Sequence, residues 1–393
     1  MKLSKLANLT FIVLILHVLF MPIGINAQSL PNNFKEELVV SGLGLSTDLK
    51  SLPDGKILVT EKSGKVYLVD PTIPSSTLFM TLNNVDDGFE RGLLSVLLDP
   101  DFEQNNHFYL FYTTTSSRVR ISRFNSLGNS GDSGSETVIW ESTHVYNASQ
   151  LYHFGGAMDF ANDGTLFFCT GDMLQESKTQ DLQEEHGKLM RINKDGSIPA
   201  DNPFYNGGAA TGPNGELPEI FAWGLRNPFK GYYDKQSGTF IIGEVGGNDA
   251  SSSWEDVHYA KKGANYGWPD CGESGRNADG SCQGAIYEDP IYTYPHIVGK
   301  GHSLTGGVVY RNGNFPTEYQ GVYFFADFAQ SWIRYIELDQ NMMPVNKAVE
   351  FTKREPNSIN STKGYVALIQ GIDGSLYFLD ILNTNDGSIS DGK

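Results

Sequence analysis

The sequence of 393 residues predicts an all-β fold, a six-bladed β-propeller of four-stranded antiparallel blades with long loops inserted on one face. A motif of a turn followed by an apolar strand recurs six times along the chain. Glycine is frequent, with 43 residues, and aromatic residues make up 12 % of the chain, which is typical of short strands joined by tight turns. No long amphipathic helical pattern separates the strands, which argues against Rossmann and TIM-barrel folds.

Each copy of the repeat begins with a turn that supplies a positive φ angle, and residues of strong strand preference follow it. The copies lie roughly 50 to 85 residues apart, whereas a four-stranded blade needs about 40 to 50 residues. The spacing therefore allows one blade per copy, with loops inserted in the wider gaps. The six copies are 54–59, 106–111, 163–168, 237–242, 320–325 and 373–378.

The first 27 residues have the pattern of a secretory signal. Lys2 and Lys5 precede the apolar run 11–20, and the sequence Ile-Asn-Ala at 25–27 forms a plausible cleavage site. The alternative is an uncleaved membrane anchor, but the run is shorter than the roughly 20 residues needed to span a bilayer. We expect one domain over 28–393, secreted or periplasmic, that is not attached to a membrane after cleavage.

Composition and charge narrow the possible partners. The formal net charge of −17 becomes −19 when the two lysines of the signal are removed. Such a surface disfavours nucleic acid and anionic membranes. Acidic side chains are also natural Ca²⁺ ligands, so calcium is an expected cofactor.

Three cysteines are present, and they differ in their surroundings. Cys271 and Cys282 flank a polar, glycine-rich loop, and in an exported protein a disulfide between them is the expected state. Cys169 lies in an alternating apolar segment, which predicts a buried free thiol. No Cys or His spacing indicates a zinc site.

The two longest insertions, 174–219 and 248–305, are expected to be loops that gather over one mouth of the central channel. His153 begins a strand next to two glycines, and Asp172 ends the following strand. If the two strands are neighbours, the aspartate orients the imidazole and raises its basicity. The alternative is a structural histidine that caps a turn.

Two further runs carry polar groups suited to ligands. Arg226 and Asn227 offer several hydrogen-bond donors for a carboxylate or a carbonyl, unless the arginine only pairs with a structural acid. Glu255 and Asp256 are followed by a tight loop at 263–269, and together they suggest a Ca²⁺ site. A solvated acidic pair is the alternative.

Five segments, in this order along the chain, resemble the glucose/sorbosone dehydrogenase family. That resemblance implies a six-bladed propeller that binds pyrroloquinoline quinone and calcium and oxidises a sugar or an aldehyde. The segments are ERGLLSVLLDPDF (90–102), HFGGAMDFANDGTLFFCTGD (153–172), HGKLMRINKDGSIPADNPF (186–204), GLRNPF (224–229) and GANYGWP (263–269).

The resemblance also implies roles for individual residues. His153 is the general base that removes the sugar hydroxyl proton, and Asp172 orients it. The residues expected near the quinone are Arg226, Asn227, Glu90 and Lys363. Backbone carbonyls of Gly246 and Gly247 are expected to hold the cofactor's calcium, and Asp256 and Tyr266, the latter through its carbonyl, belong to a second, structural calcium site.

Two departures from the family pattern keep other functions open. Ala329 and Gly364 stand where the family places cations against the quinone's carboxylates, and Lys363 is only a nearby candidate. The segment 302–328 also resembles the propeller of the hedgehog-interacting proteins, which are regarded as binding proteins. The alternatives are therefore a non-catalytic, calcium-binding propeller with a protein partner, and a Ca²⁺-dependent lactone or ester hydrolase.

Overall fold

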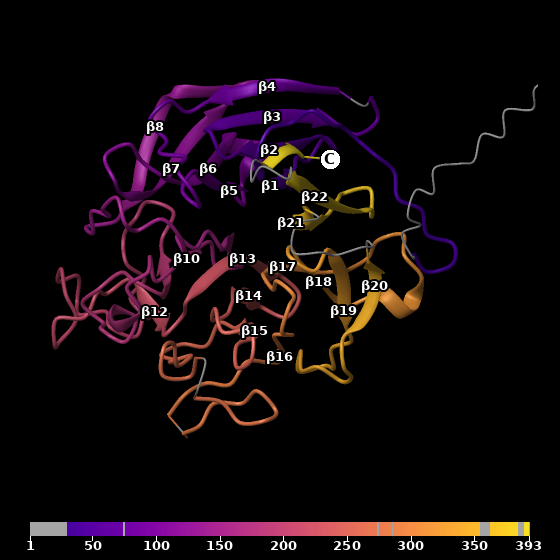
Figure 1. The fold of residues 1–393 in the computed structure, drawn as a ribbon. Coiled ribbons are helices and arrows are strands. Elements are labelled where there is room, and N and C mark those ends of the chain that lie inside the picture. The colour runs from indigo at the N-terminus through magenta and orange to yellow at the C-terminus, as the bar shows by residue number, and fades with distance from the viewer. Residues whose placement is uncertain are drawn as a thin grey trace, which may run out of the picture.

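The computed structural model describes residues 30–73, 75–272, 275–284, 286–353, 362–383 and 389–392, so the expected signal at 1–27 lies outside the described residues. Within them the chain forms antiparallel sheets arranged in a ring in chain order (Figure 1). The first two sheets contain β1 (Ser46–Ser51), β2 (Ile57–Glu61), β3 (Lys65–Asp70) and β4 (Ser75–Thr81), then β5 (Leu93–Leu98), β6 (His107–Thr113), β7 (Val119–Ser126) and β8 (Gly131–Glu141).

The next three sheets also have four strands each, and the last sheet has three. Their strands are β9 (Met158–Phe160), β10 (Leu166–Thr170), β11 (Lys188–Ile192) and β12 (Ile220–Trp223); β13 (Asn227–Asp234), β14 (Thr239–Val245), β15 (Trp254–Tyr259) and β16 (Tyr292–Pro295); β17 (Leu304–Val309), β18 (Tyr323–Asp327), β19 (Trp332–Ile336) and β20 (Val349–Lys353); and β21 (Thr362–Gln370), β22 (Leu376–Asn383) and β23 (Ile389–Gly392). The helical segments are short: α1 (Phe102–Asn105), η1 (Glu176–Lys178) and η2 (Thr317–Tyr319).

The first strands of the sheets surround the central axis. β1, β5, β9, β13, β17 and β21 contact one another in this order, and β21 contacts β1, which closes the ring. The all-β propeller with four-stranded antiparallel blades is therefore confirmed. Five blades have four strands, whereas the closing sheet has three in the described part of the chain, so the expected count of six four-stranded blades is not confirmed.

The six copies of the sequence repeat fall on equivalent strands. Each copy contributes the second strand of a sheet, namely β2, β6, β10, β14, β18 and β22. The turn before each strand contains a residue with φ between 57° and 88°, a glycine in five copies and Asn106 in the other. The turn residues from which the repeat was predicted therefore do adopt positive φ angles, and each of these strands starts directly after such a turn.

The two long insertions are not continuous loops. The first contains β11, and the second contains β15 and β16. Strands β11 and β15 were missed because charged residues occupy buried positions in them, namely Lys188 in β11 and Glu255 in β15. Such residues interrupt the apolar alternation by which a half-buried strand is recognised.

Both predictions about the cysteines are confirmed. Cys271 and Cys282 form a disulfide, and Cys169 is a buried free thiol in β10. Apolar side chains pack between neighbouring sheets; Phe111 of β6 and Phe168 of β10, for example, belong to one core cluster. Among the described residues, no helix is both long and apolar enough to cross a membrane.

The inner strands enclose a channel. A cavity of about 650 Å³ is lined by residues of all six first strands. Lys230 of β13 points into this region, and its ammonium group donates hydrogen bonds to the carbonyl of Leu94 (2.7 Å) and to Ser95 (3.2 Å), with Asp48 at 3.5 Å. A buried cation is thus held between three of the blades.

A buried acidic pair lies where the fourth and fifth blades meet. Asp327, at the end of β18, accepts hydrogen bonds from the hydroxyl of Tyr294 (2.8 Å) and from the backbone N–H groups of Ser303 (3.2 Å) and Gln330 (2.7 Å). Burial, together with the negative charge of Glu255, raises the pKa of Asp327 to about 7. The folded state therefore binds this proton more tightly than the unfolded chain does.

We predict that this carboxyl group makes the protein less stable as the pH rises from about 4 to about 7, because over that interval the folded state still holds a proton that the unfolded chain has already released. In chemical denaturation followed across this range, Asp327→Asn should lower the overall stability but flatten the pH dependence relative to the wild type. Asp101→Asn, at an exposed aspartate, should leave the slope unchanged. A slope in Asp327→Asn equal to that of the wild type would contradict the assignment.

Candidate active site

His153 and Asp172 are brought together at one end of the third blade. His153 precedes β9 and Asp172 follows β10, and these two strands are neighbours in the sheet. The Nδ1 atom of His153 lies 2.8 Å from Oδ1 of Asp172. Because the carboxylate accepts the proton of Nδ1, the other ring nitrogen, Nε2, is left as the basic atom.

The carboxylate of Asp172 is itself fixed by donors from other segments. Trp268 donates its indole N–H to Oδ2 (3.0 Å), and the backbone N–H of Leu174 donates to Oδ1 (2.9 Å). The backbone N–H of Asp172 is bonded to the carbonyl of Arg226 (2.7 Å). Trp268 was not assigned to the pair from the sequence, because it is 96 residues away along the chain.

Glu90 joins the second blade to this pair. Its Oε2 atom accepts the backbone N–H of His153 at 2.7 Å, and its own N–H is bonded to the carbonyl of Leu151 at 3.1 Å. Asn227 makes a similar contact from the fourth blade, since its Oδ1 accepts the N–H of Gly155 at 3.2 Å. The segment that carries the histidine is therefore held from both sides by residues that the resemblance placed near the quinone.

Strained backbone surrounds the pair. Phe89, His153, Met173 and Leu174 all have positive φ angles, between 48° and 64°, a conformation that costs a non-glycine residue about 1 to 3 kcal/mol. The ring of Phe89, which is 60 % exposed, lies edge to face with the ring of Tyr152 at 5.8 Å. Together they present an exposed aromatic surface next to His153 that the sequence did not predict.

Arg226 lies beside the segment expected to hold the cofactor's calcium. Its guanidinium donates to the carbonyl of Val245 (3.3 Å) and to the side chain of Asn248 (2.7 Å), so it spans Gly246 and Gly247. It also lies over the Trp268 ring at 5.4 Å. A Cβ at Gly246 would come within 1.7 Å of a backbone oxygen of β15, so that close approach requires glycine.

The side chains of Glu255 and Asp256 point to opposite faces of β15, as consecutive residues of a strand do. Glu255 is bonded to the imidazole of His296 (2.7 Å) and to the N–H of Leu304 (2.7 Å). Asp256 is paired with Arg276 instead. The structure therefore does not bring these two carboxylates together at one site.

Tyr266, expected to bind the structural calcium through its carbonyl, lies beside Asp256 and lines the same small cavity. The hydroxyl of Tyr266 is bonded to the carbonyl of Tyr259 (2.5 Å), and its ring packs on His258 at 4.6 Å. Lys363 is the second residue of β21, and its side chain is outside the described part of the structure. The ring of Phe328 covers the backbone at Gly364, since a Cβ there would lie 2.2 Å from it.

The family model for glucose / sorbosone dehydrogenase matches residues 44–389. The chain belongs to this family. It is 27 % identical over 89 % of its length to an uncharacterised protein of Synechocystis, of which the match covers 84 %.

Two named relatives match shorter parts of the chain. The aldose sugar dehydrogenase YliI of Escherichia coli is 31 % identical over 46 % of this chain and 46 % of its own length. The mouse Hedgehog-interacting protein is 26 % identical over 52 % of this chain and 32 % of its own length. The chain thus spans about half or less of the length of these relatives.

Solved structures share the fold across almost the whole chain. A glucose dehydrogenase superposes with a TM-score of 0.74 at 22 % identity, covering 91 % of this chain and 98 % of its own. The PQQ-bound aldose sugar dehydrogenase of Streptomyces coelicolor superposes with a TM-score of 0.69 at 20 % identity, covering 93 % and 98 %. At these identities the structural likeness establishes the propeller fold.

We predict that Glu90 stabilises the backbone of His153. Hydrogen bonds to a charged acceptor contribute about 1.5 to 3 kcal/mol, so Glu90→Leu should lower the free energy of unfolding by an amount in that range. Glu90→Gln keeps an acceptor oxygen and should cost less. Denaturant unfolding measures both changes, with the exposed Glu103→Leu as the control. Equal losses in Glu90→Leu and the control would show that the contact adds nothing.

Proposed function

We propose that this protein is a sugar dehydrogenase that oxidises an aldose, or a related aldehyde, with pyrroloquinoline quinone and calcium as cofactors. Membership of the family and the named dehydrogenase relatives support an oxidoreductase that acts on sugars. The observation that carries the proposal is the hydrogen-bonded set of His153, Asp172 and Trp268, which holds an imidazole ready to accept a proton.

In this proposal Nε2 of His153 takes the proton from the hydroxyl group on the anomeric carbon of the sugar. The same carbon loses its hydrogen as hydride, and the ring oxygen and the former hydroxyl oxygen remain on it as a lactone. The quinone, when bound, supplies the hydride acceptor. Asp172 stabilises the imidazolium that forms, and Trp268 keeps the carboxylate in place. The exposed rings of Phe89 and Tyr152 offer an apolar surface for the C–H face of the sugar.

The mouth around His153 offers groups that suit a quinone with three carboxylates. Arg226 is a buried cation beside Asn227, and both contact the segments that carry the pair. Lys62 adds a second cation near Glu90 and Arg91, although burial lowers its pKa. We propose that Arg226 and Lys62 take the role of the cations missing at Ala329 and Gly364. Lys363 is proposed as a further contact.

We also propose that the backbone carbonyls of Gly246 and Gly247 bind the cofactor's calcium. Their position next to Arg226 supports this, because the guanidinium and the calcium then face the same anionic ligand. Export through the signal at 1–27, to the cell exterior or the periplasm, remains part of the proposal.

A non-catalytic binding propeller is the second candidate. The ring of Phe328 over Gly364, with Ala329 beside it in sequence, makes this part of the mouth less cationic than the family pattern. Similarity to a protein named for its interaction with Hedgehog also favours it. Under this candidate, the same mouth binds a protein partner and His153 is structural.

A titration separates the two candidates. We expect micromolar pyrroloquinoline quinone and Ca²⁺ to bind the purified protein, and the complex to reduce a redox dye when aldoses are added. Quinone binding is measured by absorbance, and dye reduction is measured with a panel of aldoses. Absence of quinone binding at micromolar concentration would exclude the dehydrogenase and leave the binding propeller.

We predict that His153→Ala reduces turnover about 10²- to 10⁴-fold, the usual contribution of a positioned general base. The affinity for the quinone should stay within a few-fold of the wild type, because the imidazole acts on the sugar. His107→Ala, at a histidine on the second blade, is the control. Wild-type turnover in His153→Ala would remove this residue from the mechanism.

Trp268 is predicted to act as a positioning residue through Asp172. Trp268→Phe removes the indole N–H and keeps an aromatic ring, so it should lower kcat about tenfold or more and leave KM and the melting temperature nearly unchanged. Trp223→Phe, on the neighbouring β12, is the matched control. A loss confined to KM or to stability would instead indicate a structural role.

A further inference from the structure

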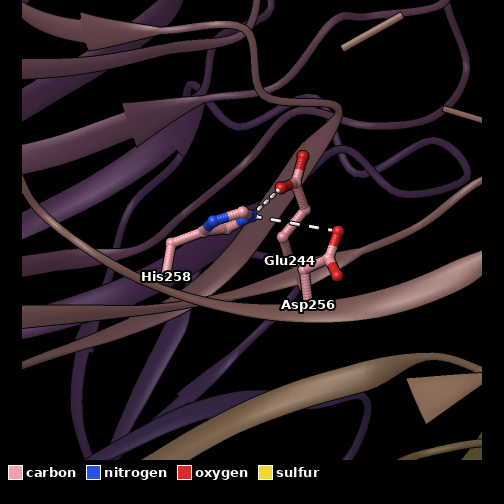
Figure 2. A group of neighbouring side chains, drawn as sticks. All are labelled: Glu244, Asp256 and His258. Carbon is pink, nitrogen blue, oxygen red and sulfur yellow. Dashed lines mark hydrogen bonds and ion pairs between the residues drawn. The ribbon is translucent and has the colours of Figure 1, made fainter. Parts of the chain in front are cut away.

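Glu244, Asp256 and His258 form a buried cluster on two adjacent strands of the fourth blade. Glu244 and Asp256 are directly paired between β14 and β15, and all three residues are at most 5 % exposed. Figure 2 shows the imidazole pointing toward both carboxylates, with Nε2 of His258 at 2.7 Å from Glu244 and 4.0 Å from Asp256. Their ligand atoms lie within 4.8 Å of one another, a spacing that a metal ion could bridge.

Two carboxylates opposite each other across a strand pair repel when both are charged. In a buried position this repulsion is barely screened by solvent, and each charge also loses its hydration. A cation close to this pair relieves the repulsion. The guanidinium group of Arg276, in the loop between β15 and β16, lies at this position.

Arg276 makes a two-pronged contact with Asp256. Its Nη1 donates to Oδ1 at 3.0 Å and its Nη2 donates to Oδ2, while Nη1 also donates to the carbonyl of Gly280 at 2.8 Å. The side chain of Arg276 is only 9 % exposed. The planar guanidinium group therefore contacts both carboxylate oxygens, which a metal ion bound by this carboxylate in bidentate mode would also need.

The loop that carries Arg276 is anchored at both ends. The disulfide Cys271–Cys282 closes it, and Arg276 and Cys282 form an isolated antiparallel bridge. The side chain of Gln283 also donates to the carbonyl of Arg276 at 2.8 Å. The arginine is thus held in place by covalent and backbone constraints.

Little room is left for an additional ion. Glu244 already accepts the N–H of Arg226 with one oxygen and contacts His258 with the other. A cavity of about 10 Å³ remains between Glu244, Asp256, Tyr266 and Arg276, which is about the space of one water molecule. The residues expected for a structural calcium therefore do not fit it while Arg276 is in place.

We propose that Arg276 is a built-in counter-ion that replaces a divalent metal at Asp256 and makes this site independent of calcium. The guanidinium balances the buried carboxylates, and the disulfide loop delivers it. This inference does not rest on the proposed dehydrogenase activity, because it concerns the stability of the protein without the quinone.

The test measures the melting temperature of the quinone-free protein in EDTA and in millimolar CaCl₂. The wild type should melt at the same temperature in both. Arg276→Ala should melt lower in EDTA by about 5 °C or more, since a buried carboxylate is left unpaired, and CaCl₂ should restore part of the loss. Lys261→Ala, which breaks an exposed ion pair with Glu288 in the same blade, should show neither effect.

A double variant distinguishes the loss of a counter-ion from a general folding defect caused by substituting Arg276. Asp256→Asn/Arg276→Gln lacks both charges, so it should melt higher in EDTA than Arg276→Gln alone and should not respond to calcium. A rise in the wild-type melting temperature on adding CaCl₂ that Asp256→Asn abolishes would overturn the proposal. So would an Arg276→Ala protein that is as stable as the wild type in EDTA.

Discussion

Closure of the ring is the constraint on which the site depends. The inner strand β21 packs against β1 and completes the ring of inner strands around the channel. For this reason, residues far apart in sequence, such as Glu90, His153 and Asn227, meet around one segment. The second, third and fourth blades contribute these groups at their strand ends, and none of the three alone contains all of them. The strained backbone around His153 is tolerated because the neighbouring blades hold it from both sides.

The interior holds charges that are balanced by cations of the chain itself. Lys230 lies between three blades, and Lys188 donates to three backbone carbonyls at 2.6 to 3.3 Å, although burial lowers its pKa to about 7. Arg276 donates hydrogen bonds to the buried carboxylate of Asp256. These groups bring hydrogen-bond donors to places where a buried carboxylate or a set of carbonyls would otherwise need water or a metal ion.

The sequence predicted those features that depend on local patterns. The second strand of each blade was recognised because a turn with positive φ precedes an apolar alternation, and the contact of His153 with Asp172 followed from their places at the ends of neighbouring strands. Strands β11 and β15 were missed because buried charges interrupt their pattern. The same omission explains why Glu255 and Asp256 were expected to form a calcium site together. Assigning β15 as a strand would have placed their side chains on opposite faces of the sheet. Trp268 lies 96 residues from Asp172 along the chain, and Arg276 reaches Asp256 from a loop 20 residues away, so the periodicity of the strands reveals neither contact.

Replacement of a metal by an arginine also bears on the proposed catalysis. The Gly246–Gly247 turn is held by Glu255, which accepts the backbone N–H of Gly246. On the strand before the turn, Glu244 accepts the backbone N–H of Arg226. Asp256, which follows Glu255, is paired with Arg276. If the supporting cation is covalently part of the chain, the backbone around this turn is set without calcium. Under the proposed function, calcium is then needed only where the quinone would bind, and removing it would lower activity without lowering stability. In a protein that needed a structural calcium ion, EDTA would lower activity and stability together. Measuring the loss of activity and the loss of stability in EDTA therefore distinguishes a structural calcium site from one in which Arg276 replaces the metal.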